Sequence, residues 1–343
     1  MIDLNNKTVL VTGGTGSFGR AFLTYALENY PSLVRIIIFS RDEYKQHELR
    51  TGLSKDKLSF VKFVIGDVRD LPRLTEVMEE EKVDFVCHAA AFKHVSIGEE
   101  NPGEFMKTNI QGSENVIHAC KAAGVKKAVL LSTDKAVNPV SVYGTSKLYA
   151  EKLFIAANKK DDATTVFSVI RFGNLLGSRG SVLPLFIQKA REGSIPITDE
   201  RMNRFHISNS EVVALALFAL EYSLGGEVVV PKMKSFKIID LAKAVDSTCK
   251  LELTGAKPGE KFHEELLDES NSKNVIETDY YYIVPPPYKA FSTLDHLKGH
   301  NPVKHSRPFV YASDTNFDWL SIEGLRKVIQ EELGNDALVA SSR

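Results

Sequence analysis

Short apolar runs alternate with amphipathic segments through the first half of the chain. Such runs are typical of parallel strands buried on both faces. The segments between them carry apolar residues every three or four positions, as helices do. We predict helices, for example, over Leu71–Glu81 and Thr108–Ala123. Strands that alternate with helices predict an α/β protein with a doubly wound parallel sheet and right-handed crossovers. The predicted strands are Thr8–Thr12, Arg35–Phe39, Ser59–Ile65, Phe85–Ala89, Lys127–Ser132 and Thr165–Arg171.

The pattern changes beyond about residue 173. Residues 211–222 predict an amphipathic helix, and the segment that starts at Lys257 predicts another helix continuing through Leu267. Residues 268–312 are rich in proline, tyrosine and histidine and show little periodicity. This half of the chain is therefore expected to form few strands.

The first predicted strand runs directly into a glycine-rich turn and then into a helical pattern. The spacing is G-x-x-G-x-x-G. Glycine allows a tight turn and lets the backbone approach a pyrophosphate, which the free N–H groups of the following helix would bind. The order of strand, glycines and helix predicts a Rossmann-type dinucleotide site rather than an ordinary turn. The contacts expected here are Gly13, Thr15, Gly16, Ser17, Phe18 and Gly19.

The end of the second predicted strand bears on the choice between NADP and NAD. An acidic residue there would hold the ribose 2′-hydroxyl of NAD. Ser40 followed by Arg41 suits a 2′-phosphate better, with Lys45 near enough to help. Asp42 and Glu43 keep the alternative open, because either could bind the ribose if the strand ended later. We predict NADP, with NAD less favoured and a solvated Arg41 as the alternative interpretation.

Small or polar residues also follow the other predicted strands, at the edge of the sheet where ligands bind. Asp67 is expected to accept a hydrogen bond from the adenine amino group or, alternatively, to cap a turn. Lys93 could contact phosphate or substrate, or could lie on the surface. The further cofactor contacts expected at these ends are Asp67, Val68, Ala89, Ala90, Ala91, Lys93 and Asn174.

The stretch from Ser132 to Lys147 carries two acid–base pairs. On a helix, Tyr143 and Lys147 share one face. A nearby ammonium favours phenolate over phenol, so we expect Lys147 to lower the pKa of Tyr143. Such a tyrosine can take a proton from a sugar hydroxyl while hydride leaves the same carbon. Asp134 and Lys135 add a second pair, with a solvated surface pair as the alternative. Two pairs predict oxidation followed by elimination or epimerisation.

These features divide the chain. Residues 1–173 are predicted to form the dinucleotide-binding domain. Residues 174–334 are predicted to form mainly a smaller substrate-binding cap that returns one strand, near residues 226–231, to the main sheet. Residues 335–343 are expected to be a frayed tail.

Composition excludes several classes of protein. A net charge of −1 over 343 residues gives no bulk attraction for nucleic acid. The 3 cysteines (Cys87, Cys120 and Cys249) lack paired spacing and the histidines lack metal-ligand spacing. We therefore expect buried thiols in a reducing cytoplasm and no metal site. No apolar run approaches the roughly 18–20 residues that span a bilayer, so no membrane association is expected.

Several further segments belong with these motifs, and together they cover most of residues 7–267. They are GGTGSFGR (13–20), FSRDEYKQ (39–46), GDVRD (66–70), HAAAFKHV (88–95), STDKAVNP with YGTSK (132–147), RFGNLLGSRGSV (171–182), ITDERMNRF (197–205) and KPGEKFHEEL (257–266). The set resembles the extended short-chain dehydrogenase/reductase family and, within it, the nucleotide-sugar 4,6-dehydratases of polysaccharide biosynthesis. A similar capsule-synthesis subgroup has Met-Gly where this chain has Tyr143-Gly144, which argues against that subgroup.

The resemblance implies a UDP-N-acetylglucosamine 4,6-dehydratase of the configuration-inverting type that opens pseudaminic acid synthesis. A tightly bound NADP, recycled in each turnover, would take hydride from C4 while Tyr143, as phenolate, removes the C4 hydroxyl proton. Lys135 would then remove the C5 proton, for which it must be neutral and its pKa must fall. Asp134 would protonate the departing C6 hydroxyl, and hydride would return to C6. Reprotonation of C5 from the opposite face would invert it and give a UDP-2-acetamido-2,6-dideoxy-hexos-4-ulose.

The alternative within the same family is a UDP-hexosamine C4 or C5 epimerase that uses the same oxidation step. The resemblance also makes Thr133 the hydroxyl partner of the Tyr143–Lys147 pair and implies a homo-oligomer. Arginines suit the diphosphate of a UDP-sugar, whereas Glu260 could instead cap its own segment. The substrate contacts expected are Lys93, Lys135, Asn174, Arg179, Val182, Thr198, Met202, Arg204, Lys257 and Glu260.

Overall fold

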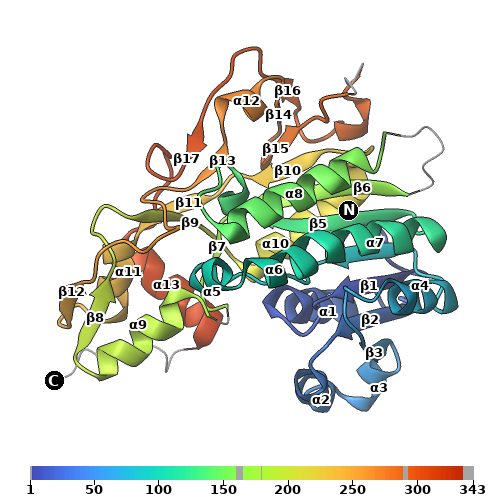
Figure 1. The fold of residues 1–343 in the computed structure, drawn as a ribbon, viewed down its shortest axis with the longest axis horizontal. Coiled ribbons are helices and arrows are strands. Elements are labelled where there is room, and N and C mark those ends of the chain that lie inside the picture. The colour runs from blue at the N-terminus through green and yellow to red at the C-terminus, as the bar shows by residue number, and fades with distance from the viewer. Residues whose placement is uncertain (1, 160–164, 179, 289–292, 335–343) are drawn as a thin grey trace.

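The structure is a computed structural model that describes residues 2–159, 165–178, 180–288 and 293–334. Within these ranges the chain forms a 10-stranded sheet with helices on both faces and a smaller unit beside it (Figure 1). The strand order is β16-β14-β15-β10-β6-β5-β4-β1-β2-β3. The strands from β10 to β3 run parallel, and β15, β14 and β16 extend the sheet as antiparallel strands.

The strands of the main sheet are β1 (Thr8–Thr12), β2 (Arg35–Ser40), β3 (Val61–Ile65), β4 (Phe85–His88), β5 (Lys127–Thr133), β6 (Val166–Phe172), β10 (Val228–Pro231), β14 (Ile276–Glu277), β15 (Tyr281–Val284) and β16 (Val303–Lys304). The parallel part confirms the predicted α/β class. Each predicted strand is present, β1 with the predicted ends and the others with one or both ends shifted by one or two residues. β3, for example, begins at Val61 rather than Ser59.

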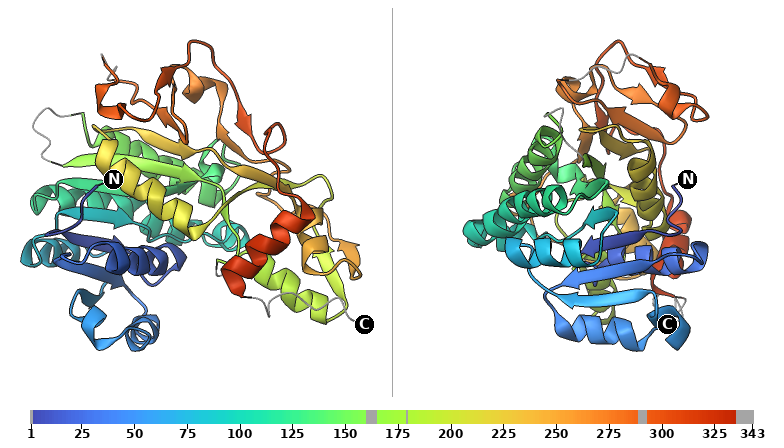
Figure 2. Two further views of the ribbon diagram at one scale, coloured as in Figure 1. Left: turned by 180° about the vertical axis from the view of Figure 1, so that it is seen from behind. Right: turned by 90° about the vertical axis from the view of Figure 1, so that its right-hand side faces the viewer.

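Helices cover both faces of this sheet. α4, α7 and α8 pack side by side on one face, whereas α1 packs against α10 on the other (Figure 2). The helices that follow the parallel strands are α1 (Ser17–Asn29), α2 (Glu43–Thr51), α3 (Lys55–Leu58), α4 (Leu71–Glu80), α5 (Val95–Glu100), α6 (Pro102–Phe105), the π-helical turn η1 (Met106–Gln111), α7 (Gly112–Ala122), the 3₁₀ turn η2 (Asp134–Ala136), α8 (Val142–Ala156) and α10 (Asn209–Tyr222). The predicted helix over residues 108–123 thus begins as a π-turn and becomes α-helical at Gly112.

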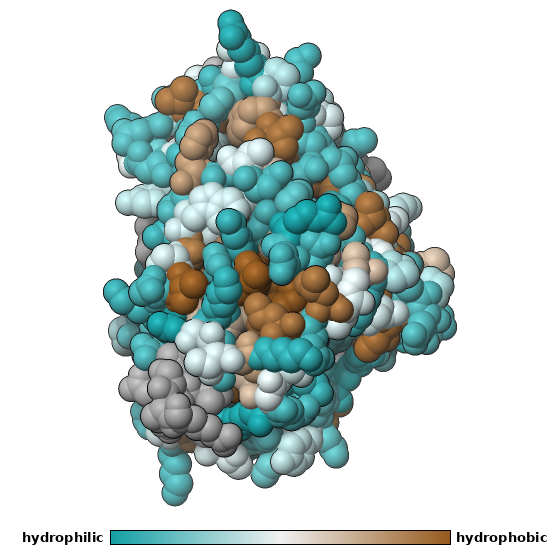
Figure 3. Space-filling view, turned by 90° about the vertical axis from the view of Figure 1, so that its left-hand side faces the viewer, coloured by the Kyte–Doolittle hydropathy of each residue, from teal (hydrophilic) through white to brown (hydrophobic). Residues whose placement is uncertain are grey.

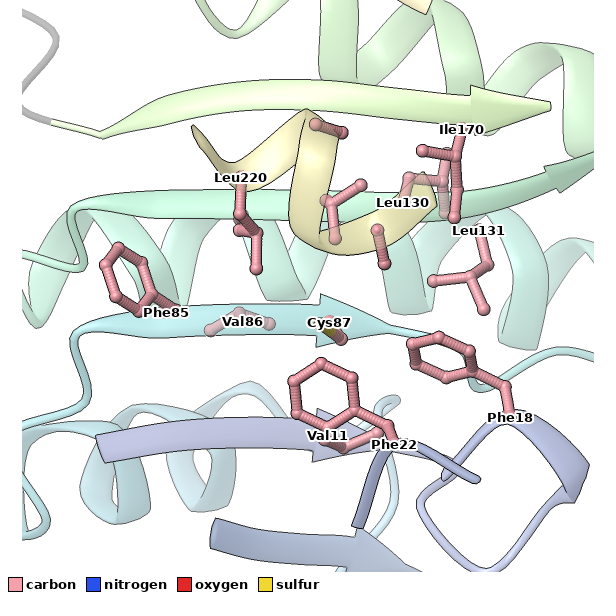
Figure 4. Packing of buried hydrophobic residues seen from close by; sticks show 14 of the residues in the cluster. Val11, Phe18, Phe22, Phe85, Val86, Cys87, Leu130, Leu131, Ile170 and Leu220 are labelled. Carbon is pink, nitrogen blue, oxygen red and sulfur yellow. The ribbon is translucent and has the colours of Figure 1, made fainter. Parts of the chain in front are cut away.

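The apolar runs predicted as strands are buried because helices lie over both of their faces. All of β1 is buried, and β2 is buried from Ile36 onwards. In Figure 4, Phe22 of α1 and Leu220 of α10 lie over the strands that carry Val11 and Val86. This continuous apolar core fixes the register of the strands and therefore the position of the turns at their carboxyl ends.

The smaller unit has a core of its own, in which Phe186, Phe236 and Leu241 are fully or almost fully buried. The side of the molecule that Figure 3 shows is largely hydrophilic, with a group of hydrophobic residues near the middle. In the part of the chain that the structure describes, no helix has the length and apolar character needed to cross a membrane. The elements outside the main sheet are β7 (Asn174–Leu175), α9 (Val182–Arg191), β8 (Ser194–Ile197), β9 (Asn203–Ile207), β11 (Lys234–Lys237), α11 (Ile238–Val245), β12 (Lys250–Leu253), β13 (Glu265–Leu267), α12 (Glu269–Ser272), η3 (Asp295–Leu297), β17 (Tyr311–Ala312) and α13 (Ile322–Leu333).

Two predictions for the second half are wrong. The segment from Lys257 to Leu267 is not a helix. Gly259 has a φ of +82°, and the chain then enters β13, which pairs with β17. The helix α10 is not amphipathic, because it packs against α1 and the strands β5, β6 and β10 and is buried around most of its circumference. In both places, long-range packing decides the structure over local pattern.

The weakly patterned residues 268–312 build the antiparallel end of the main sheet through β14, β15 and β16. β14 and β16 have two residues each, too few to show a period of two, and the four residues of β15 lie in a segment with little periodicity, so the sequence did not predict them. The strand near residues 226–231 pairs in parallel with β6, as Val228–Pro231. The division of the chain at residue 173 stays a prediction, and the expected tail at 335–343 lies outside the described residues.

Candidate active site

The turn between β1 and α1 can be built only with glycine. Gly13 has a φ of +65°, and a Cβ on it would lie 2.8 Å from the backbone of Ala90. A Cβ on Gly19 would lie 2.2 Å from the carbonyl oxygen of Gly14. Gly16, which precedes α1, has no side chain to cap it, so the first N–H groups of the helix remain available to an anion. This geometry fits the pyrophosphate of a dinucleotide.

The other residues predicted in this turn contribute in different ways. Ser17 is the first residue of α1, and the carbonyl of Thr15 accepts a hydrogen bond from Arg20 Nε at 3.1 Å. Phe18 is 5% exposed and stacks on Phe22 in the core, with ring centroids 5.6 Å apart. The Phe18 side chain therefore belongs to the packing of α1 (Figure 4), and only its backbone remains for a cofactor.

The acidic residue after β2 is already committed to its own helix. Asp42 caps α2 by accepting the N–H of Lys45 at 3.0 Å, and its other oxygen lies 2.6 Å from Lys45 Nζ. The hydrogen bonds from Lys45 hold the pKa of Asp42 below its usual range. Ser40 Oγ accepts a hydrogen bond from Gln46 at 2.9 Å. Asp42 is thus less free to bind a ribose than an acidic residue at the strand end would be.

Arg41 lies on the other side of this strand end, against the turn that follows β3. Its guanidinium is 3.5 Å from Asp67 and lies 5.1 Å from the centre of the Phe92 ring. Asp67 also caps its own turn, since it accepts the N–H of Arg69 at 3.0 Å. Val68 is buried, and its carbonyl accepts a hydrogen bond from Asn115. The capping contact uses Oδ1 of Asp67 and the contact with Arg41 uses Oδ2, so the structure shows the capping role, and the adenine contact stays a prediction.

The segment Ala89–Lys93 after β4 joins the glycine turn to the rest of the site. Ala90 donates its N–H to Thr12 Oγ1 at 3.3 Å, and Asn109 holds the N–H and carbonyl of Phe92 at 2.8 and 2.9 Å. Asn109 also donates to Ser146 of α8 at 2.9 Å. Asn109 was not predicted as a site residue, because it lies in the π-helical turn η1, where no sequence motif marks it. It fixes the 89–93 segment against the helix that carries Tyr143.

Lys93 points to the second half of the chain. Its Nζ donates to Ser178 Oγ at 3.3 Å, and burial lowers its pKa. Asn174 lies in β7, and its Oδ1 is buried with no hydrogen-bond partner among the described residues. Arg179 is among the residues that the structure does not describe. Lys93 and Asn174 therefore lie where the two halves meet, as a substrate contact requires.

The turn after β5 brings the acid–base residues together. Thr133 ends β5 and donates its hydroxyl proton to Asp134 Oδ1 at 2.8 Å. Lys135 Nζ donates to the same oxygen at 3.0 Å. Gly144 allows α8 to approach this turn, because a Cβ there would lie 2.2 Å from the carbonyl oxygen of Lys135. Backbone packing therefore places Tyr143 beside the Asp134–Lys135 pair.

A second carboxylate, which the sequence analysis did not single out, completes this group. Glu264 Oε1 lies 3.2 Å from Lys135 Nζ and 3.7 Å from Arg204 Nε. Asp134 is fully buried and Glu264 is 1% exposed. The second oxygen of each carboxylate, Asp134 Oδ2 and Glu264 Oε2, has no hydrogen-bond partner within the described part of the chain. Buried oxygens of this kind normally have a partner, so both are available to a polar ligand.

The electrostatics of this group differ from the prediction. Burial lowers the pKa of Lys135, but the carboxylates of Asp134 and Glu264 outweigh it and hold the net pKa above the usual range. Burial also raises the pKa of Tyr143 to about 12, against the opposing effects of Lys135 and of a hydrogen bond with Thr133. The sequence predicts that Lys147 lowers the pKa of Tyr143. In the structure the cation that lowers it most is Lys135.

Lys147 faces a different environment. It is 3% exposed, and burial lowers its pKa to about 8 against the opposing charge of Glu151. Glu151 itself forms a buried ion pair with Arg171 at 2.7 Å. Arg171 also donates to the carbonyl of Leu266 at 2.8 Å, so this pair ties α8 to β13. Burial thus outweighs the charge of Glu151, and the pKa of Lys147 stays below its usual range.

The remaining predicted substrate residues lie in the second half of the chain. Arg204 is 9% exposed and donates to the carbonyls of Asn203 and Phe262 at 2.7 and 3.1 Å, so it also holds the segment before β13. Glu260 accepts the N–H of Lys257 at 3.1 Å, which makes it a cap of its own turn. The others lie at element ends, with Val182 opening α9, Thr198 following β8 and Met202 buried before β9.

The chain matches a known family over most of its length. Residues 9–286 match the family described as polysaccharide biosynthesis protein. A curated relative from Campylobacter jejuni (strain 81-176), named UDP-N-acetylglucosamine 4,6-dehydratase (inverting), is 44% identical over 96% of this chain and 99% of its own length. A relative from Rickettsia bellii, named UDP-glucose 4-epimerase, is 42% identical over 82% of this chain and 83% of its own.

Solved structures with a similar fold are also found. Pen from Bacillus thuringiensis is 35% identical, with a TM-score of 0.87, and the match covers 97% of this chain and all of that one. DesIV of Streptomyces venezuelae, a dTDP-glucose 4,6-dehydratase solved with NAD, is 21% identical with a TM-score of 0.65 over 74% of this chain and 86% of its own, and it supports the fold alone. With the glycine turn, the Tyr143–Lys147 helix and the Asp134–Lys135 turn in place, the chain belongs to the polysaccharide biosynthesis protein family of extended short-chain dehydrogenases/reductases.

Proposed function

We propose that this protein is a UDP-N-acetylglucosamine 4,6-dehydratase that inverts C5. The observation that carries the proposal is the buried Asp134–Lys135 hydrogen bond beside Tyr143, which supplies an acid and a base next to an oxidation site. The 44% identity to a relative with that name over 96% of the chain supports the substrate. The product would be a UDP-2-acetamido-2,6-dideoxy-hexos-4-ulose.

The dinucleotide supplies hydride chemistry at C4 and C6 when it is bound. The residues that would hold it are those of the glycine turn, the ends of β2 and β3, and the 89–93 segment. Tyr143 would accept the proton of the C4 hydroxyl. Because its pKa is about 12, its phenolate depends on the positive charge of Lys135 and the hydrogen bond of Thr133.

One proton transfer within the ion pair gives Lys135 and Asp134 the forms that dehydration needs. Moving a proton from Lys135 Nζ to Asp134 Oδ1, across a contact of 3.0 Å, yields a neutral amine and a carboxylic acid. The amine then takes the C5 proton, and the acid gives its proton to the departing C6 hydroxyl, which leaves as water. Each group returns to its original charge, so the raised pKa of Lys135 in the ion pair is compatible with its role as base.

We propose NADP as the cofactor, because Arg41 is half-exposed at the end of β2 while Asp42 is engaged by Lys45. A guanidinium stacked on Phe92 is well suited to a 2′-phosphate. The fold neighbour DesIV was solved with NAD, so the two cofactors need to be compared directly. We also propose a homo-oligomer in the cytoplasm that feeds pseudaminic acid synthesis, on the strength of the family resemblance.

The test is an NMR time course of the purified protein with UDP-N-acetylglucosamine in D₂O. A new C6 methyl signal with deuterium at C5 is expected, and its couplings would show inversion. The second candidate is a UDP-hexosamine epimerase, which the relatives named UDP-glucose 4-epimerase favour. An altered hexosamine that keeps its C6 oxygen would establish that candidate instead. An unchanged sugar, with NADP and NAD each supplied, would refute both.

A further inference from the structure

Glu264 is held in place by backbone contacts with a distant segment. Its N–H donates to Ser313 Oγ at 2.9 Å, and its carbonyl accepts the N–H of Ser313 at 2.8 Å. Ser313 follows β17, whose pairing with β13 begins one residue after Glu264. The Glu264 carboxylate is therefore positioned by the sheet of β13 and β17 and not by the turn that carries Lys135.

The carboxylate of Glu264 reaches into the acid–base group. Glu264 Oε1 lies between two cations, at 3.2 Å from Lys135 Nζ and 3.7 Å from Arg204 Nε. Its Oε2 is buried without a hydrogen-bond partner in the described ranges, as is Asp134 Oδ2. A buried carboxylate with a free oxygen is costly to keep unless a ligand or a charge in the reaction uses it.

We propose that Glu264 is a positioning residue for C5 deprotonation, which holds Lys135 Nζ opposite Asp134 and strengthens it as a base. This inference rests on the proposed dehydratase function. When the Lys135 amine takes the C5 proton, a positive charge forms at Nζ, 3.2 Å from the Glu264 carboxylate. Attraction between these charges is larger in the transition state than before the step, because the amine is neutral at the start.

The two carboxylates have different tasks in this arrangement. Asp134 accepts a proton from Lys135 and passes it to the leaving hydroxyl, whereas Glu264 stays ionised and exchanges no proton. Arg204 lies on the other side of Glu264, with its Nε 3.7 Å from Oε1. The charged and titratable groups that face Lys135 are Asp134 from the turn after β5, Glu264 from the segment before β13, Arg204 from β9 and Tyr143 from α8.

The first test reads Lys135 directly and does not depend on activity. The protein is labelled with ¹³C at the lysine Cε, and the Lys135 signal is identified by its loss in Lys135→Arg. In the native protein the signal should stay in the ammonium form beyond the pH of about 10.4 at which a free lysine titrates. In Glu264→Gln, which keeps the shape and removes the charge, the midpoint should fall by at least about one unit. Equal midpoints in the two proteins would overturn the inference.

The second test asks which step slows. Glu264→Gln should lower kcat about 10- to 100-fold with KM changed less than about threefold, the range of a removed charge contact in a preorganised site. The isotope effect from deuterium at C5 of the substrate should rise, while that from deuterium at C4 should not. Glu264→Asp should recover part of kcat. A loss of kcat in which the two isotope effects keep their ratio would mean a merely structural role and would overturn the proposal.

Glu265→Gln is the matched control. It makes the same change one residue later on β13, where the side chain bonds Asn138 at 2.7 Å and does not reach Lys135. It should leave both the Lys135 titration and the isotope effects unchanged, and an equal effect in this variant would refute a specific role for Glu264. If the native protein fails to dehydrate the sugar, the proposed function is wrong. The Lys135 titration still decides, in that case, whether Glu264 sets the charge of Lys135.

Discussion

The two sides of the active site are built in different ways. On the sheet side, the predicted cofactor residues follow one strand after another, and each is placed by a short segment such as residues 13–19 or Asp134–Ala136. On the second side, Arg204 and Glu264 are placed by short strands that pair with segments distant in sequence, β9 with β11 and β13 with β17. Short segments of sequence therefore place the residues on the sheet side. Arg204 and Glu264, which lie next to Lys135, reach their positions only when distant segments pair.

The strongest test of the comparison is at Lys135, where the two sides meet. Lys135→Arg keeps the cation between Asp134 and Glu264 but cannot supply a neutral amine, since guanidinium does not lose its proton. We expect dehydration to fall by at least about 10³-fold, in the range of a lost general base. NMR of the sugar product measures the rate. The control is Lys261→Arg, because native Lys261 donates from Nζ to the carbonyl of Val137 at 2.6 Å. The dehydration rate of this variant should stay within about twofold of the native rate. An active Lys135→Arg would remove Lys135 from the role of base.

The next prediction concerns the ion pair that joins the two sides. Glu151→Gln leaves Arg171 buried without its carboxylate, while Arg171 still bonds Leu266 of β13. Breaking one half of a buried pair costs about 3–5 kcal/mol of unfolding free energy. Urea denaturation measures the change. Glu114→Gln, an exposed residue of α7, should change stability by less than about 0.5 kcal/mol. Similar values for the two variants would mean that this pair does not hold α8 to β13.

The glycine turn offers a test confined to the sheet side. Gly19→Ala places a Cβ 2.2 Å from the Gly14 carbonyl oxygen, so the turn must shift. We expect a loss of about 1–3 kcal/mol in stability and at least tenfold weaker dinucleotide binding, measured by thermal denaturation and calorimetry. At Gly103 of α6, a Cβ would meet no atom within 4 Å, so Gly103→Ala should leave binding unchanged. Unaltered binding in Gly19→Ala would argue against a pyrophosphate in this turn.

The smallest effect is expected at the end of β2. Arg41→Ala removes the guanidinium beside Phe92 and Asp67 and should weaken NADP binding about tenfold, or about 1.4 kcal/mol. NAD, which lacks the 2′-phosphate, should bind with nearly unchanged affinity. Titration of the protein with each dinucleotide gives the two dissociation constants. Equal losses for both cofactors would show that Arg41 does not distinguish them, and the preference for NADP would fall.

The parallel sheet was predictable because its strands are continuous apolar runs and its turns carry glycines with a spacing that has a physical cause. The acid–base turn was predictable for the same reason, since Thr133, Asp134 and Lys135 adjoin a clear strand and Tyr143 opens a clear helix. The helix predicted wrongly over Lys257–Leu267 shows where prediction from local pattern fails. A segment whose structure comes from pairing with β17 carries no local pattern that reports the pairing.

The sequence by itself determined the family, the fold class and the chemical types present at the site. Only the tertiary structure decided which charges meet. It set Glu264 against Lys135 beside Asp134, and these two carboxylates raise the pKa of Lys135, which the sequence alone predicted to fall. The physical reason is that the pKa of a buried group depends on its partners across a few ångströms of low-dielectric space, and those partners are brought there by long-range packing.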